Sequence, residues 1–283
     1  MWMLLVLVYG ILKGFREIVK KKSMEKSSVA EVLFFYTLIG FIMVIPSAFH
    51  MDKMPFPYYF YVSLKSFLIF LAWICSFKAI KKLPISLYGV LDLSRVLFAM
   101  LLGVVVLDEV LNFYQIIGLI FVSAGLLLLK YRPFTSKTSE KQNSFSIYIV
   151  FALISCVLNA VSGLMDKLLM KKITSTQLQF WYMLFLVIFY FIYLLFSKTK
   201  VNIKNAVTNY WIWILSIMFI IGDKALFIAN GMTDSRITIM TLIKQSCCIV
   251  TILSGKFIFK EKNVGYKFFC ASIIIIGIVI SVL

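Results

Sequence analysis

Acidic residues, histidine and proline are scarce in this sequence. Its 283 residues include 12 Asp and Glu, 1 His and 5 Pro, so the side chains used in acid–base catalysis and metal binding are in short supply. The 5 Cys all fall within apolar runs, which excludes the paired loop spacing of a disulfide framework or a zinc site. The sequence contains no GxSxG, HExxH or Asp-rich metal motif. These absences argue against an enzyme, and we expect neither a cofactor nor a resident metal.

Hydrophobic side chains are abundant instead. They make up 62% of the chain, and the mean hydropathy is +0.98, well above the range of soluble domains. The net charge of +17 comes from Lys and Arg that lie mostly in short links between apolar runs, a pattern typical of membrane anchoring and orientation. We therefore expect a multi-pass protein of a bacterial-type cell membrane, with the lipid bilayer as its partner and no nucleic acid.

The apolar runs are long enough to cross a membrane. A hydrocarbon core of about 30 Å is crossed by a helix of roughly 17–25 residues. The longest polar link divides the runs into two sets, so we expect a first five-helix domain at 1–129, a basic connecting loop at 130–145 and a second five-helix domain at 146–283. The predicted fold class is an all-α membrane protein with ten transmembrane helices. The expected spans are 2–19, 29–49, 58–79, 84–106, 111–129, 146–169, 176–196, 209–230, 236–256 and 264–283.

The two sets of five spans look like copies of one another. A shift of 152 residues places Glu109 opposite Glu261. Nearer the start of each half, FFYTLIGF (34–41) aligns with FWYMLFLV (180–187) at a shift of 146. Because five is an odd number of spans, the second copy must enter the membrane from the opposite side. The sequence therefore predicts two inverted five-helix repeats, the architecture that secondary transporters use to build two alternating gates around a central site.

One segment resembles a known family. Residues 77–129 lead from a short turn into a helix, then to a Glu after an apolar run, and then to a final helix that contains Gly. This pattern is similar to the repeat of the EamA-like branch of the drug/metabolite transporter superfamily, and residues 229–282 form a weaker copy with Glu261 at the acidic position. The second copy has Arg236 where the first has Pro84. The resemblance implies a ten-helix transporter; the superfamily carries amino acids, nucleotide sugars, organic phosphates, cations and drugs.

Several charged side chains fall inside the predicted spans. An ionised group at the centre of a bilayer costs about 2.5–3.5 kcal/mol on insertion scales, so such residues tend to face a bundle interior. The basic residues near the end of the first span, Lys13 and Arg16, are equally well explained by side chains that extend to the membrane surface. The charged candidates are Lys13, Arg16, Glu17, Lys65, Asp92, Arg95, Asp166, Lys167, Asp223, Lys224 and Lys244.

Asp92 and Arg95 are the best placed of these candidates. Their spacing of three puts them on one helical face, either as an ion pair that supports helix packing or as part of a substrate site. The shift of 152 places Asp92 opposite Lys244, so we expect the two to occupy equivalent walls of one central cavity. Gly222 is expected to let helices approach closely beside Asp223. The predicted substrate-binding residues are Asp92, Arg95, Lys244, Tyr88, Asp223 and Trp73, and the candidate coupling residues are Glu17 and Asp166.

The charged candidates also bear on the substrate. Seven are basic and four are acidic, which favours a small polar anion or zwitterion, such as an amino acid or a related metabolite. We predict a secondary transporter that works by alternating access, with the proton as candidate coupling ion and a monomer or homodimer as the working unit. The alternatives are an uncoupled exchanger of a phosphorylated metabolite and an exporter of drugs or organic cations.

The orientation in the membrane stays open at the sequence level. Sixteen basic residues fall in the links that join spans 1–2, 3–4, 5–6, 7–8 and 9–10, and four fall in the other links. The positive-inside rule then places both termini outside the cell. The family resemblance implies the reverse orientation, with both termini in the cytoplasm.

Overall fold

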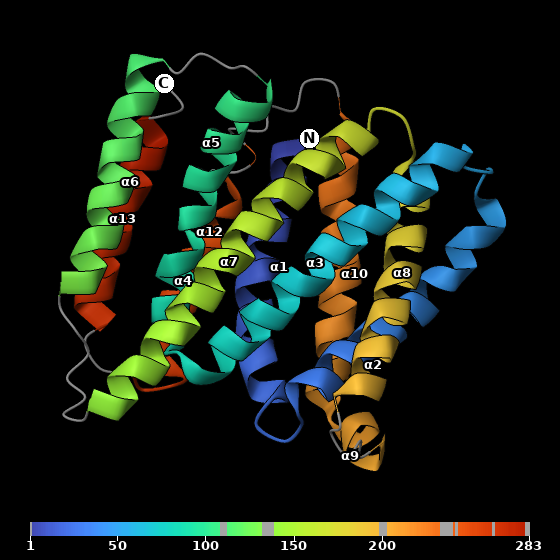
Figure 1. The fold of residues 1–283 in the computed structure, drawn as a ribbon, viewed down its shortest axis with the longest axis horizontal. Coiled ribbons are helices and arrows are strands. Elements are labelled where there is room, and N and C mark those ends of the chain that lie inside the picture. Colours follow the sequence, from blue (N-terminus) through green and yellow to red (C-terminus); the bar gives the residue numbers. More distant parts are fainter. Residues whose placement is uncertain are drawn as a thin grey trace.

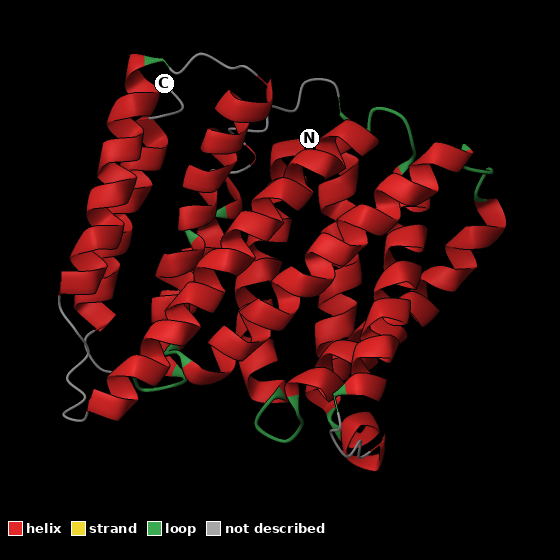
Figure 2. Cartoon of the chain, in the orientation of Figure 1, coloured by secondary structure: helices red, strands yellow, loops and turns green. Residues whose placement is uncertain are grey.

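The chain folds into a bundle of helices (Figures 1 and 2). A computed structural model describes residues 2–107, 112–131, 139–197, 203–232, 240, 243–261 and 264–280, and within these ranges every regular element is helical. The elements are α1 (Trp2–Ser23), α2 (Val29–Val44), η1 (Ile45–His50), α3 (Phe56–Lys82), α4 (Ile85–Asp92), α5 (Ser94–Leu107), α6 (Phe113–Tyr131), α7 (Ser139–Leu169), α8 (Ser175–Phe196), α9 (Ile203–Thr208), α10 (Tyr210–Gly231), α12 (Ser246–Phe257) and α13 (Val264–Ile280).

Matching local signals start the second long helix of each half. At α2 the Ser28 hydroxyl accepts a hydrogen bond from the Glu31 N–H at 3.2 Å, and the Glu31 carboxylate accepts one from the Ser28 N–H at 2.7 Å. At α8, Thr174 and Gln177 form the same capping box, at 3.2 and 2.8 Å. Each box satisfies N–H groups that the first turn of a helix leaves free. The boxes lie 146 residues apart (174 − 28 = 146), the shift found in the sequence alignment.

The helices that carry Asp92 and Lys244 are each interrupted. At Leu93 the backbone N–H binds the Val90 carbonyl at 3.1 Å, a three-residue spacing in place of the four of an α-helix. Around Gln245, which separates helical residues 243–244 from α12, the Cys248 N–H binds the Gln245 carbonyl at 2.9 Å. The two interruptions are 152 residues apart (245 − 93 = 152), so the repeat extends to the local backbone.

Packing between the helices also repeats. Helix α1 of the first half lies against α10 of the second, and its counterpart α7 of the second half lies against α3 of the first. Helices α6 and α13 pack together at one side of the molecule (Figure 1). Figure 1 shows that α1 runs away from the end that carries the chain termini, whereas α7 runs toward it. Gly277 permits the α6–α13 contact, because a Cβ there would lie 2.6 Å from the Phe121 Cβ and 2.8 Å from the Gly118 carbonyl oxygen.

The structure supports membrane insertion, and it identifies fewer clear spans than the ten that the sequence predicts. Among the residues that the structure describes, five stretches are long and apolar enough to cross a bilayer: Val29–Phe49, Phe56–Lys82, Ser146–Leu169, Ser175–Phe196 and Tyr210–Gly231. Three shorter apolar helices accompany them, at Ile116–Leu128, Ser246–Phe257 and Val264–Gly277. Helix α1 differs because three charged residues interrupt its apolar sequence within positions 2–19. The ten-span count therefore stays a prediction.

The predicted loop at 130–145 needs correction. Helix α6 continues to Tyr131 and α7 begins at Ser139, so both ends of this polar segment are helical. The periodic apolar signal that marks a span ends at the membrane boundary, whereas a helix can extend beyond it into polar sequence. The middle of the segment, 132–138, lies outside the described residues, as does Glu109.

Candidate functional site

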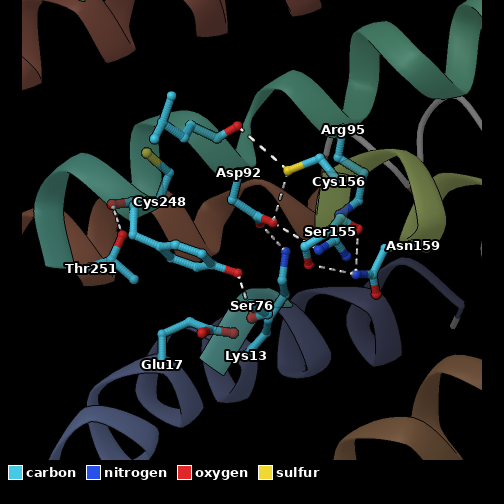
Figure 3. Close-up of polar contacts among 12 residues, drawn as sticks. Lys13, Glu17, Ser76, Asp92, Arg95, Ser155, Cys156, Asn159, Cys248 and Thr251 are labelled. Atoms are coloured by element: carbon cyan, nitrogen blue, oxygen red, sulfur yellow. Dashed lines mark hydrogen bonds and ion pairs between the residues drawn. The ribbon is translucent and has the colours of Figure 1, made fainter. Parts of the chain in front are cut away.

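The Asp92 carboxylate lies at a junction of four helices. Lys13 of α1 forms a salt bridge with its Oδ2, and the Arg95 Nη2 of α5 lies 2.7 Å from its Oδ1 (Figure 3). The Cys156 thiol of α7 lies 3.6 Å from the Leu91 carbonyl oxygen and 3.9 Å from the Asp92 Oδ1. The side chains of Lys13 and Asp92 are each only 5% exposed, and that of Arg95 is 20% exposed. The predicted Asp92–Arg95 contact is present, with a second cation added to it.

A pair of glycines explains why Lys13 is buried. A Cβ on Gly10 would collide with the Ser246 hydroxyl, and one on Gly14 would lie 2.6 Å from the Val250 Cβ. The sequence Gly10-Ile-Leu-Lys-Gly14 thus brings α1 onto α12 as small-xxx-small motifs do in membranes. Lys13 lies between the two glycines and is directed into the bundle. The interpretation of Lys13 as a membrane-surface side chain is therefore wrong.

Arg16 is also buried, in a second ion pair on the same helix. Its Nη1 lies 3.0 Å from the Asp223 Oδ1 of α10, and its guanidinium carbon lies 5.3 Å from the centre of the Phe219 ring. The Trp73 ring packs against Phe219 at 5.1 Å between centroids. Asp223 therefore contacts Arg16 directly, whereas Trp73 packs on the Phe219 ring beside it. The contacts found for Asp92 are with other side chains. A Cβ on Gly222 would meet Tyr9 at an ordinary 3.6 Å, so the predicted close approach at Gly222 is wrong.

A third buried ion pair joins α3 to α7. The Lys65 Nζ lies 2.9 Å from the Asp166 Oδ1 and 3.6 Å from the centroid of the Tyr182 ring. The α3–α7 contact that holds this pair is the counterpart of the α1–α10 contact, and each of the two contacts joins one helix of each half. The signs are exchanged, because α1 contributes a cation whereas its counterpart α7 contributes an anion. Asp166 is thus engaged by protein in this conformation.

The remaining predicted residues Glu17 and Tyr88 have partners within the protein. The Glu17 Oε1 lies 2.8 Å from the Lys20 Nζ. The Tyr88 hydroxyl shares a hydrogen bond of 2.8 Å with the Ser76 Oγ, and the Tyr88 side chain is buried. The Glu17 Oε1 and the Tyr88 hydroxyl are therefore engaged by neighbouring side chains, whereas the Glu17 Oε2 is buried without a hydrogen-bond partner among the described residues.

Lys244 differs from the other cations of the bundle interior. It is half-buried, and it has no salt-bridge partner within the part of the chain that the structure describes. It interacts electrostatically at longer range with Asp166 and Asp223, and also with Lys13 and Arg95. The Gln245 Oε1 and the Ser246 Oγ beside it are buried and lack a hydrogen-bond partner among the described residues.

The charges near the two helix interruptions do not balance. Lys13 and Arg95 share one carboxylate, and Lys244 adds a third cation, which leaves an excess of two positive charges. Elsewhere in the bundle each described ion pair sets one cation against one carboxylate. The region around Asp92, Arg95 and Lys244 is therefore the candidate site, and its chemistry suits an anionic group.

A shallow groove of about 400 Å³ lies on α6, well apart from this cluster. Its lining is Ile116, Leu119, Ile120, Ser123, Ala124 and Leu127. Ile120 and Leu127 are strongly exposed, as expected of a surface that faces lipid. The groove has no charged lining residue and therefore does not compete with the central cluster as the site.

Comparison with known proteins agrees with the two-half organisation. The family model described as the EamA-like transporter family matches residues 1–131 and 146–283. No curated protein sequence matches the chain. Among 27 matching chains of solved structures, one crystal structure covers 99% of this chain and 95% of its own, with a TM-score of 0.69 and 13% identity. At that identity the likeness concerns the fold alone. Since the family match spans nearly all of both halves, the chain belongs to the EamA-like transporter family.

Proposed function

We propose that this protein is a secondary transporter that moves a small anionic or zwitterionic metabolite, such as an amino acid, by alternating access. The observation that carries the proposal is the unbalanced positive charge around Asp92, Arg95 and Lys244. Cations inside a membrane protein are costly unless an opposite charge accompanies them. A carboxylate or phosphate on the substrate would supply the missing negative charge, and Asp92 would orient an amino group.

The arrangement of the helices supports alternating access. The counterparts α1 and α7 run in opposite directions (Figure 1), and the two halves interrupt one helix each at equivalent positions. In transporters built from inverted repeats, the site lies between the halves near such irregular helices. The proposal therefore includes ten spans in two inverted sets of five, although the structure identifies five clear spans.

Proton coupling is part of the proposal. Asp166 and Glu17 each pair with one lysine, at 2.9 and 2.8 Å, so a proton could replace that lysine when the helices move apart. Uncoupled exchange of a phosphorylated metabolite is the second candidate, because the same excess of cations also suits a phosphate. A pH gradient across the membrane separates the two, since only the coupled transporter would use it.

The test is uptake into proteoliposomes by the protein and by the variants Arg95→Gln and Lys244→Gln. Loss of one hydrogen bond to a charged group costs about 1.5–3 kcal/mol, so we expect each variant to reduce uptake by about tenfold or more. Lys53→Gln, at an exposed loop position, is the matched control and should transport normally. Normal uptake by both folded site variants would remove these residues from the mechanism, and uptake of organic cations alone would support an exporter.

A further inference from the structure

A buried polar cluster joins the two halves at the start of α4, and we call it the α4 clamp. It consists of Glu261, Ser86 and Lys267. The Glu261 Oε1 accepts a hydrogen bond from the Ile85 N–H at 2.5 Å, and its Oε2 accepts one from the Ser86 N–H at 3.2 Å and another from the Ser86 hydroxyl. The Lys267 ammonium donates to the Ser86 Oγ at 2.6 Å and to the Glu261 Oε2 at 3.2 Å.

The clamp supplies what α4 lacks at its N-terminus. Pro84 precedes the helix and provides no side-chain cap, so the first N–H groups of α4 depend on another partner. A carboxylate suits this position because the N-terminus of a helix carries partial positive charge. Glu261 comes from the loop after α12 in the other half of the chain. The acidic residue of the repeat pattern therefore caps a helix of the opposite half.

The backbone around Glu261 is shaped to reach α4. Lys260 has φ of 49°, in the left-handed region that residues other than glycine seldom adopt. This turn lets the Glu261 N–H bind the Gly255 carbonyl at 2.8 Å. A Cβ on Gly255 would lie 2.9 Å from the Ser86 Cβ and 3.0 Å from the Glu261 Oε2. The end of α12 thus lies directly against the start of α4.

Helix α4 connects the clamp to the candidate site. It contains eight residues, all of them buried, and spans about 12 Å. Its first turn is held by Glu261, and its last residue, Asp92, is held by Lys13 and Arg95. The interruption at Leu93 separates this short segment from α5. A movement of α4 at either end would therefore be transmitted to the other end.

We propose that the α4 clamp is a gate, closed in this conformation, that seals the site from the end of the molecule where α4 begins. The proposal rests on the proposed transport function and assigns Glu261 and Lys267 as positioning residues. Release of Glu261 from Ile85 and Ser86 frees the start of α4 from α12. The region around Asp92 then becomes accessible from that end of the molecule.

The test uses Cys156 as a native reporter beside Asp92. In a background where Cys75, Cys247, Cys248 and Cys270 are replaced by Ser, a membrane-impermeant methanethiosulfonate is added to membrane vesicles of either orientation. Glu261→Gln weakens the hydrogen bonds that hold the start of α4, because they are made to a charged group. We therefore expect the rate of Cys156 modification to rise about tenfold when the reagent is added at the clamp end, and to stay unchanged when it is added at the other end. Glu25→Gln changes an acid that is 53% exposed in the turn after α1 and should leave the rate unchanged. Cys156→Ser gives the unreactive baseline.

Two outcomes would overturn the gate. One is an unchanged rate in folded Glu261→Gln, and the other is equal acceleration from both ends, which would indicate general loosening. If Glu261→Gln does not fold, the same labelling measurement on Ser86→Ala tests the gate. This variant removes only the hydroxyl that joins Glu261 to Lys267. Labelling requires no substrate, so the gate is tested separately from transport. Normal uptake by the Arg95→Gln and Lys244→Gln variants would contradict the transport site. It would leave the labelling result for the clamp unaffected.

Discussion

Leu93 and Gln245 interrupt their helices at equivalent positions in the two halves, 152 residues apart. The residue before the first interruption is Asp92 and the residue before the second is Lys244, so equivalent positions carry opposite charges. The Arg16–Asp223 and Lys65–Asp166 pairs each join a cation of the first half to a carboxylate of the second. The backbone architecture is therefore repeated, whereas the charges are complementary. In the proposed site the two walls therefore carry different charged groups, as the orientation of a polar substrate requires.

Asp92→Asn is expected to destabilise the folded protein strongly. The Lys13 and Asp92 side chains are both 5% exposed, and removal of the carboxylate leaves buried cations without a partner. Breaking a buried pair in this way costs on the order of 3 kcal/mol, which thermal unfolding in detergent would detect. The double variant Lys13→Met with Asp92→Asn should recover part of that loss. A double variant as unstable as the sum of the single variants would contradict the coupling.

The Lys65–Asp166 pair should behave differently from a surface pair. We expect Lys65→Met and Asp166→Asn to destabilise the protein singly, and a double-mutant cycle to give a coupling free energy of about 0.5–3 kcal/mol. The Lys22–Glu25 pair, whose side chains are 29% and 53% exposed, should give no measurable coupling, because solvent screens exposed pairs. Equal coupling for both pairs would show that burial does not govern these interactions.

Gly14→Ala tests the contact that buries Lys13. Its added Cβ would lie 2.6 Å from the Val250 Cβ and 3.0 Å from the Cys247 carbonyl oxygen, so α1 must move away from α12. Overpacking of this kind costs about 1–3 kcal/mol, measurable as a lower unfolding temperature. Gly163→Ala is the matched control, because nothing lies within 4 Å of its added Cβ. Equal stability of the two variants would contradict close packing at Gly14.

Much of the fold could be predicted from the sequence. The apolar runs locate most helices within a few residues, and the shifts of 146 and 152 recur in the capping boxes and in the helix interruptions. These features are local or periodic, so one sequence contains them. The full extent of α7 could not be predicted in this way, because its first residues are polar and extend beyond the predicted span.

The pairing of charges could not be predicted in the same way. Asp92 and Arg95 are three residues apart, and their contact follows from helix geometry. Lys13 reaches Asp92 from 79 positions away, and Arg16 reaches Asp223 from 207 positions away. Such contacts depend on which helix faces meet, which the charge pattern alone does not specify. The Gly10–Gly14 spacing was the available signal for Lys13, and the role of Glu261 had no local signal.

The most direct test of the account is a thermal-shift screen of the purified protein against anionic, zwitterionic and cationic metabolites, repeated with Arg95→Gln and Lys244→Gln. A ligand present at one hundred times its Kd stabilises the folded state by about 2.7 kcal/mol. We predict that an anion or zwitterion raises the unfolding temperature and that both variants abolish the shift. Stabilisation by organic cations alone, or an anion-induced shift that persists in both variants, would contradict the proposed site.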